Sequence, residues 1–327
     1  MFYPHIAGAG YHVPPRVVTN EDLRAYYDTS DAWIRERSGI QERRFATEGQ
    51  GPVDLAVPAV EQALAEAGLE ARDVDMIVFA TLSPEYYFPG SGCLLQRRLP
   101  FRQIPALDIR MQCSGFIYAL SIAEMYIKQG VYRHVLVVGA EVQSTSINFE
   151  PEGRAVGVIF GDGAGAFVLS AGTEPRGILS SHLHTDGNYA EELTIQEPTS
   201  LVHGKFGKLP HGIWPHMNGR EVYKHAVRHM SEAIQEGLRQ QGWTAGQLDC
   251  VVPHQANLRI GMAIAEDLGV PFEKFFMNIQ RYGNTTAASI PIAFCEAVQA
   301  GRIRRGDRVM LVAFGSGFTW GSAALIY

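Results

Sequence analysis

The sequence VLVVGA at residues 135–140 is matched by VMLVAF at residues 309–314, and the two runs begin 174 residues apart (309 − 135 = 174). Each is a short apolar run of the kind that forms a buried strand. Each also follows a helical pattern that ends in glycine, Gly130 before the first run and Gly301 before the second. We therefore expect two helix–strand units of the same design.

A second pair of units has the same spacing. The helical pattern at residues 55–68 leads into DMIVF, the pattern at residues 230–241 leads into DCVVP, and these strands also begin 174 residues apart (249 − 75 = 174). Helices that alternate with short apolar runs predict an α/β fold with a largely parallel sheet. The shared offset predicts a duplicated half, with residues 1–172 and 173–327 as its two copies.

Composition excludes several classes of protein. The net formal charge of −6 argues against a nucleic-acid binder, which usually carries a basic surface. Four dispersed cysteines do not make a disulfide scaffold or a Cys-x-x-Cys zinc site. No apolar run reaches the roughly 18 residues of a membrane span, and the start has no secretion signal. We expect a cytoplasmic protein with free thiols and no membrane partner.

Cys113 lies in the sequence LDIRMQCSGF, between a strand-like stretch and a helix expected at residues 115–129. A helix N-terminus favours a thiolate, so we expect a lowered pKa and a nucleophilic role. The alternative is a buried core cysteine, which is a common fate of free cysteines. Cys93, Cys250 and Cys295 have no comparable setting; Cys250 lies within a predicted strand and Cys295 within a predicted helix, so core roles are expected for these two.

Two further residues occupy positions where chemistry is expected. His254 follows a predicted strand, at the end where α/β sheets place their sites. It could donate a hydrogen bond to an oxyanion, or it could be a loop histidine whose hydrogen bonds are made to the backbone. Asn284 is either a helix N-cap or an amide donor. Cys113 and Asn284 each precede a helix-ending glycine by 17 residues (130 − 113 and 301 − 284), which predicts equivalent positions at two helix N-termini.

Three other segments are open to more than one interpretation. His182, His184 and Asp186 have a spacing that metal ligands use, but a loop between strands is favoured. The glycines of residues 161–165 precede a strand and fit neither a P-loop nor a dinucleotide motif. Residues 201–217 are expected to form a surface loop without assigned chemistry.

Cys113, His254 and Asn284, in this order and in these surroundings, resemble the ketoacyl-ACP synthase III family of the thiolase superfamily. The resemblance covers nearly the whole chain. Its motifs are TSDAWIRERSGIQER (29–43), QCSGF (112–116), FGDGAGA (160–166), PHQANLRI (253–260), GNTTAASIP (283–291) and FGSGFTWGSA (314–323). It implies the thiolase fold, in which duplicated α/β halves form a five-layer αβαβα sandwich.

The resemblance also implies a mechanism. The Cys113 thiolate attacks an acyl-CoA, and the backbone N–H groups of Cys113 and Ser316 form the oxyanion hole. A malonyl thioester, malonyl-ACP being favoured, then places its carbonyl between His254 and Asn284. Decarboxylation gives an enolate that attacks the acyl group and releases a β-ketoacyl thioester. No metal or redox cofactor is needed, because acyl-CoA and the malonyl thioester are substrates.

Family position also suggests how the substrate is held. Trp33 would stack on the CoA adenine, Arg37 and Arg154 would contact its phosphate or base, and Asn257 would contact the pantetheine. Phe314 would pack near the catalytic pocket.

The same resemblance suggests protein partners. Phe88 matches a residue that reaches across a homodimer interface into the partner's acyl pocket. Lys224 and Arg259 lie on the face expected to meet acyl carrier protein, although the nearby Glu266 and Asp267 weaken a docking argument from positive charge.

The chain departs from the family pattern at two site positions. Ser114 follows the nucleophile where primary-metabolism members usually have alanine, and Ser316 replaces the middle of a three-glycine run. These and other features resemble secondary-metabolism relatives of the alkylquinolone or resorcinol type, which use longer acyl or β-keto substrates. The remaining alternatives are an acyltransferase to a small hydroxyl or amine, a non-catalytic acyl-CoA binder, and a cysteine hydrolase. The hydrolase is disfavoured because no dedicated general base accompanies Cys113.

Overall fold

Two β-sheets form the frame of the protein in the computed structural model, which describes residues 2–201 and 209–327. The first sheet has the strand order β1-β7-β6-β4-β5, and the second has the order β11-β12-β13-β8. The first comprises β1 (Tyr3–His12), β4 (Met76–Ala80), β5 (Ala106–Ile109), β6 (His134–Glu141) and β7 (Gly163–Gly172). The second comprises β8 (Gly177–Thr185), β11 (Cys250–Pro253), β12 (Arg308–Gly315) and β13 (Thr319–Ile326).

The offset of 174 residues recurs in these elements. It separates the starts of β1 and β8 (177 − 3) and of β6 and β12 (308 − 134). It also separates Gly68 and Gly242, the left-handed glycines that end α2 and α6 (242 − 68). The boundary predicted between the halves falls in the turn between β7 and β8.

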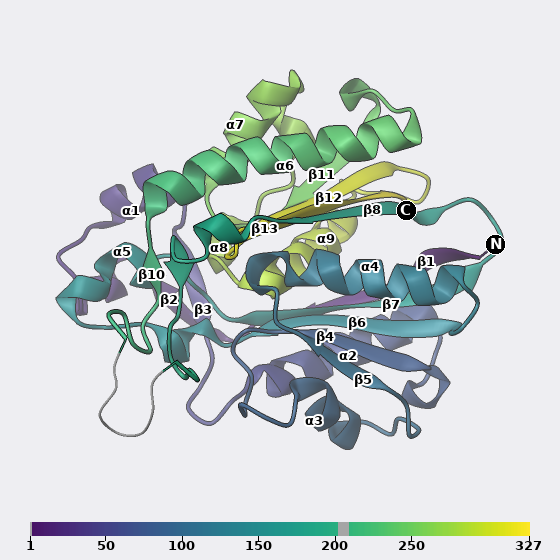
Figure 1. Cartoon of the computed structure of the whole chain (residues 1–327), viewed down its shortest axis with the longest axis horizontal. Helices are drawn as coiled ribbons and strands as arrows, with labels where there is room; N and C mark the ends of the chain where they lie inside the picture. Colours follow the sequence, from purple (N-terminus) through teal and green to yellow (C-terminus); the bar gives the residue numbers. More distant parts are fainter. Residues whose placement is uncertain (1, 202–208) are drawn as a thin grey trace.

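Helices on both sides of each sheet complete a five-layer αβαβα arrangement, as the family resemblance implied (Figure 1). The largely parallel sheet predicted from the sequence is wrong: both sheets are mixed, because β7 pairs antiparallel with β1 and β6, and β13 pairs antiparallel with β12 and β8. The outer layer on the first sheet contains α2 (Pro52–Ala67) and α3 (Ser91–Arg98). The layer shared by both sheets contains α4 (Gly115–Lys128) and α9 (Ser289–Gln299). The outer layer on the second sheet contains α6 (Gly219–Gln241) and α7 (Leu258–Leu268).

Short elements connect these layers. They are β2 (Arg16–Thr19), α1 (Asp31–Ser38), β3 (Glu42–Phe45), α5 (Arg154–Gly157), β9 (Leu193–Thr194), β10 (His216–Met217) and α8 (Ile279–Tyr282). Residues 202–208 of the expected 201–217 loop lie outside the described residues. In the part of the chain that the structure describes, no helix has both the length and the apolar character to cross a membrane.

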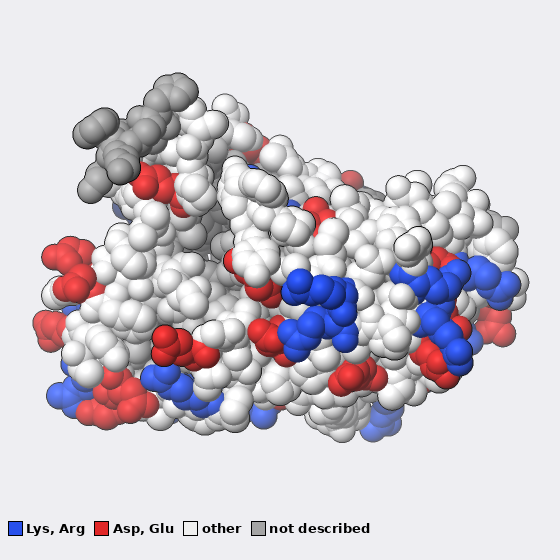
Figure 2. All heavy atoms as spheres, turned by 90° about the horizontal axis from the view of Figure 1, so that it is seen from below, with Lys and Arg blue, Asp and Glu red and all other residues white. Residues whose placement is uncertain are grey.

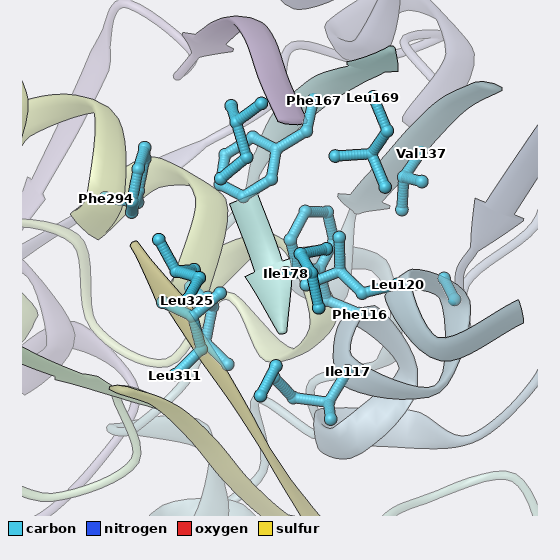
Figure 3. Close-up of a cluster of buried hydrophobic side chains, with 14 of the residues drawn as sticks. Phe116, Ile117, Leu120, Val137, Phe167, Leu169, Ile178, Phe294, Leu311 and Leu325 are labelled. Carbon is cyan, nitrogen blue, oxygen red and sulfur yellow. The ribbon is translucent and has the colours of Figure 1, made fainter. Parts of the chain in front are cut away.

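The shared helical layer is buried on both sides. Every residue of α9 from Ser289 to Ala297 is buried, which explains why its sequence is apolar around its whole circumference. Aromatic rings tie the layer to both sheets: Phe167 of β7 lies 5.0 Å from Phe116 of α4 and 4.9 Å from Phe294 of α9, both edge to face (Figure 3). Phe294 in turn lies 5.1 Å from Tyr327 at the end of the second sheet. One hydrophobic core therefore joins the facing sides of the two sheets through the shared helices.

Replacing Phe167 should test how much this junction contributes to stability. Phe167→Ala removes a fully buried ring that contacts both helices of the shared layer, so we expect the free energy of unfolding to fall by about 3–5 kcal/mol in urea denaturation. Met125→Ala is the control, because Met125 on α4 is 53% exposed and its loss should cost less than about 0.5 kcal/mol. A similar cost for both variants would contradict the role given to the ring.

Candidate active site

Two turns with unusual backbone conformation begin the two helices of the shared layer. Cys113 lies in the 3₁₀ turn Gln112–Ser114 before α4, and Gln112 has φ 47°. The corresponding turn Thr286–Ala288 precedes α9, and Thr286 has φ 45°. Left-handed conformations are uncommon for residues other than glycine and concentrate at functional sites. The two residues are 174 positions apart (286 − 112), so both turns belong to the repeat.

This correspondence corrects one expectation from the sequence. The counterpart of Cys113 is Ala287 (287 − 113 = 174), so Cys113 and Asn284 are not equivalent. The cause is helix length: α4 has 14 residues and α9 has 11, so counting back from the final glycines shifts the alignment by three. Asn284 instead precedes the second turn.

Each turn packs against a strand of the opposite sheet. The Cys113 turn contacts β12 and the Thr286 turn contacts β6, and the two turns contact each other. The approach is close enough to require glycine: a Cβ on Gly315 would lie 3.0 Å from the Cys113 backbone nitrogen, and one on Gly139 would lie 2.5 Å from the Ala287 carbonyl oxygen. Ser316 follows Gly315 directly, which brings the segment proposed for the oxyanion hole against the nucleophile.

Asn284 is held so that its amide faces the thiol. Its side-chain oxygen accepts the Thr286 N–H at 2.8 Å, and its backbone N–H donates to the Ile159 carbonyl at 2.9 Å. The Gly161 N–H donates to the Asn284 carbonyl at 3.0 Å, so the glycine segment without assigned chemistry helps to place this residue. The Asn284 side chain also lies close enough to the Cys113 thiol to lower its pKa.

His254 is fixed from two sides. Its backbone N–H donates to the Val312 carbonyl at 2.8 Å, which seats it at the end of β11. Its ring Nδ1 lies 2.7 Å from the Ser289 hydroxyl at the start of α9. His254 is 5% exposed and Asn284 6%, so both side chains face a nearly water-free site.

Burial sets the protonation of the resting site. It raises the pKa of the Cys113 thiol to about 12, with a further contribution from the nearby Glu141 carboxylate. Hydrogen bonds from its own backbone and from Asn284 favour the thiolate but do not offset this. The expected lowering of the Cys113 pKa is therefore wrong for the unliganded protein. Burial also lowers the pKa of His254 to about 3, so the site holds a neutral thiol and a neutral imidazole.

The residues expected to bind CoA lie together on α1, α5 and the start of α7. The guanidinium carbons of Arg37 and Arg154 lie 4.6 and 5.0 Å from the centre of the Trp33 ring. Arg154 is oriented by the Asp28 carbonyl at 2.8 Å. Asn257 donates to the Arg37 carbonyl at 2.8 Å, and its side-chain oxygen caps α7. Their binding roles remain predictions.

The other expected residues lie in three places. Phe314 is buried on β12, with its ring 4.8 Å from that of Phe318. Phe88 is 81% exposed. Lys224 on α6 and Arg259 on α7 are exposed on adjacent helices, and both helices also carry exposed carboxylates. The face in Figure 2 likewise mixes basic and acidic side chains.

The two histidines whose spacing suggested a metal site contact a carboxylate instead. His182 and His184 lie on strand β8, not in a loop. Their ring nitrogens lie 3.4 and 2.6 Å from the Glu236 carboxylate of α6. Across residues 2–201 and 209–327, no group of three or more His, Cys, Asp or Glu side chains has an arrangement that could hold a metal ion.

Sequence reasoning missed several residues that shape the site. Glu141 ends β6 fully buried and accepts hydrogen bonds from Thr81 Oγ1, Ser83 Oγ and the Leu82 N–H. Its signal was a charged residue directly after an apolar strand. Ser289, which contacts His254, gave no signal, because a serine near a helix start is ordinary.

Comparisons with known proteins all point to one family. Family models for 3-oxoacyl-[acyl-carrier-protein] synthase III and its C-terminal part match residues 107–187 and 238–327. The β-ketoacyl-[acyl-carrier-protein] synthase III of Methylococcus capsulatus is 46% identical over 325 residues, 99% of both chains. The synthase III 1 of Vibrio cholerae is 43% identical over 321 residues, 98% of both chains. The crystal structure of the Aquifex aeolicus synthase III has a TM-score of 0.92, 42% identity and full coverage of both chains.

The neutral state of His254 predicts a specific pH dependence. In the unfolded chain the imidazole protonates near its ordinary pKa of 6.5, whereas burial holds the folded pKa at about 3. Acidification from pH 7 to pH 5 therefore destabilises the native protein, by on the order of 2 kcal/mol from this residue. In urea titrations at both pH values, His254→Gln should lose less stability than the parent by that amount. Equal losses would contradict a buried neutral His254.

Proposed function

Because the chain belongs to the β-ketoacyl-[acyl-carrier-protein] synthase III family of thiolase-like condensing enzymes, we propose that Cys113, His254 and Asn284 are its catalytic residues. The protein is an acyltransferase that carries out the decarboxylative condensation of fatty acid biosynthesis. The observation that carries the residue assignment is their convergence in one buried site. The Cys113 turn contacts the Thr286 turn, which Asn284 precedes, and His254 contacts Ser289 at the start of the same helix.

The first step is acyl transfer to Cys113. The Cys113 sulfur attacks the acyl-CoA carbonyl, the bond from that carbonyl to the CoA sulfur breaks, and the thiol proton of Cys113 leaves on CoA as its free thiol. The backbone N–H groups of Cys113 and Ser316 are the donors for the oxyanion, which is supported by the contact of Gly315 with the Cys113 backbone. Because a neutral thiol is a weaker nucleophile than a thiolate, Cys113 reacts little with other electrophiles before the acyl-CoA is bound.

The second step is decarboxylative condensation. The malonyl thioester carbonyl accepts hydrogen bonds from the Asn284 amide and His254 Nε2–H; a Ser289 O–H directed at Nδ1 would keep the proton on Nε2. Loss of CO₂ gives an enolate held by those donors. Its carbon attacks the acyl carbonyl, the bond to Cys113 breaks, and the β-ketoacyl thioester leaves.

Acyl-CoA and acyl carrier protein are the proposed partners. The stack of Arg37, Trp33 and Arg154 offers an aromatic face between two cations, which suits an adenine with phosphates. Lys224 and Arg259 would meet the carrier protein, whose malonyl thioester we favour over malonyl-CoA.

We also propose a homodimer. The edge strand β5 leaves Leu107 39% exposed, and the loop before α3 exposes Tyr86, Tyr87 and Phe88. Phe88 would enter the acyl pocket of the partner subunit.

The four cysteines are free in the structure, which supports a cytoplasmic location.

The nucleophile is tested by acyl labelling. Incubation with radiolabelled acyl-CoA should label the parent protein and leave Cys113→Ala blank, with mass spectrometry giving the acyl length. Cys250→Ala is the matched control, because Cys250 is also a buried thiol but lies within β11. Equal labelling of the parent and Cys113→Ala would overturn the assignment.

The two donors are tested by separating the steps. His254→Ala and Asn284→Ala should still form acyl-enzyme but lose condensation about 10²–10³-fold or more, because each removes a donor to the enolate. The assay follows release of ¹⁴CO₂ and of β-ketoacyl product from pre-acylated enzyme. Full condensation in either variant would instead favour simple acyl transfer to another acceptor.

A further inference from the structure

Two hydroxyl side chains connect the nucleophile turn to the backbone that follows β12. Ser114 Oγ lies 2.7 Å from Thr319 Oγ1, and Thr319 Oγ1 donates to the Ser316 carbonyl at 2.9 Å. Ser114 is fully buried and Thr319 is 3% exposed. The two positions at which the chain departs from the family pattern, Ser114 and Ser316, therefore contact the same side chain.

Only two arrangements of the two buried hydroxyl protons place one of them between Ser114 and Thr319, as their 2.7 Å separation requires. In one, Thr319 donates to Ser114, which donates to the Met111 carbonyl 2.8 Å away. In the other, Ser114 donates to Thr319, which donates to Ser316. The Met111 carbonyl already accepts the Ser114 backbone N–H at 3.2 Å. The second arrangement therefore gives both carbonyls a donor, which buried polar groups require.

Ser316 is thereby held at two points, its carbonyl and its side chain. Its carbonyl is held by Thr319, and its own hydroxyl donates to the Leu193 carbonyl of β9. The Ser316 N–H lies in the preceding peptide, with the Gly315 carbonyl. Anchoring the carbonyl and the side chain of residue 316 nevertheless fixes its Cα, and so restricts where its backbone nitrogen lies before substrate binds. Preorganised donors of this kind account for much of the effect of an oxyanion hole.

We propose that the Ser114–Thr319 hydroxyl pair is a positioning device that aims the Ser316 N–H at the oxyanion of acyl transfer. It joins the two halves of the chain at the reacting centre, since Ser114 belongs to the first and Thr319 to the second. The inference rests on the proposed function in one respect, the use of the Ser316 N–H as an oxyanion donor.

The test compares Thr319→Val, which keeps the shape and loses the hydroxyl, with Thr319→Ser, which keeps the hydroxyl. The readout is the single-turnover rate of Cys113 acylation by acyl-CoA over a range of concentrations. Thr319→Val should lower the maximal rate about tenfold with half-saturation unchanged, and Thr319→Ser should remain within about threefold of the parent. Ser322→Ala is the matched control: its hydroxyl, on the same strand, donates to the Ala233 carbonyl at 2.7 Å, away from Cys113.

A double-mutant cycle tests whether the two hydroxyls act together. Ser114→Ala alone should slow acylation, but it should add nothing in the Thr319→Val background, because the two hydroxyls act as one unit. If Thr319→Val does not fold, Ser114→Ala alone decides. Parental rates in the folded variants would overturn the proposal. Absence of acylation at Cys113 in the parent itself would instead overturn the proposed function.

Discussion

The site depends on a helical layer that two sheets must share. Because α4 and α9 are packed between the sheets, each begins against the opposite half of the chain, and their first turns meet. Cys113 in one turn and Asn284 beside the other are brought together by this constraint. The crossing also explains the glycines at positions 139 and 315, where a side chain would separate strand from turn.

The same packing determines the electrostatics. A site enclosed by two sheets and two helices excludes water, and exclusion of water disfavours every charge that is not paired. This outweighs the helix N-terminus behind Cys113, so the thiol and the imidazole are both neutral at rest. Charge then arises only during reaction, next to donors that are already in place.

Much of this architecture was predictable from the sequence. The spacing of VLVVGA and VMLVAF gave the repeat, and the turn residues and motif order located Cys113, His254 and Asn284. Other features were not predictable, because they depend on contacts between distant segments. The sign of the Cys113 pKa shift follows from burial by the second half, and the strand position of His182 and His184 depends on pairing with β13. The link between Ser114 and Thr319 spans 205 residues and leaves no local pattern.

The position of Ala287 has a consequence for how such a site can arise. A frame of two equal halves contains two equal places for a nucleophile, and this chain fills one with a thiol and the other with a methyl group. With alanine at position 287, the second turn adds no competing sulfur beside the donor Asn284, which precedes it. The two halves have nearly the same backbone, but they differ chemically because one turn carries a thiol and the other a methyl group. The first half therefore supplies the attacking sulfur, and the second supplies groups that stabilise the reacting charge.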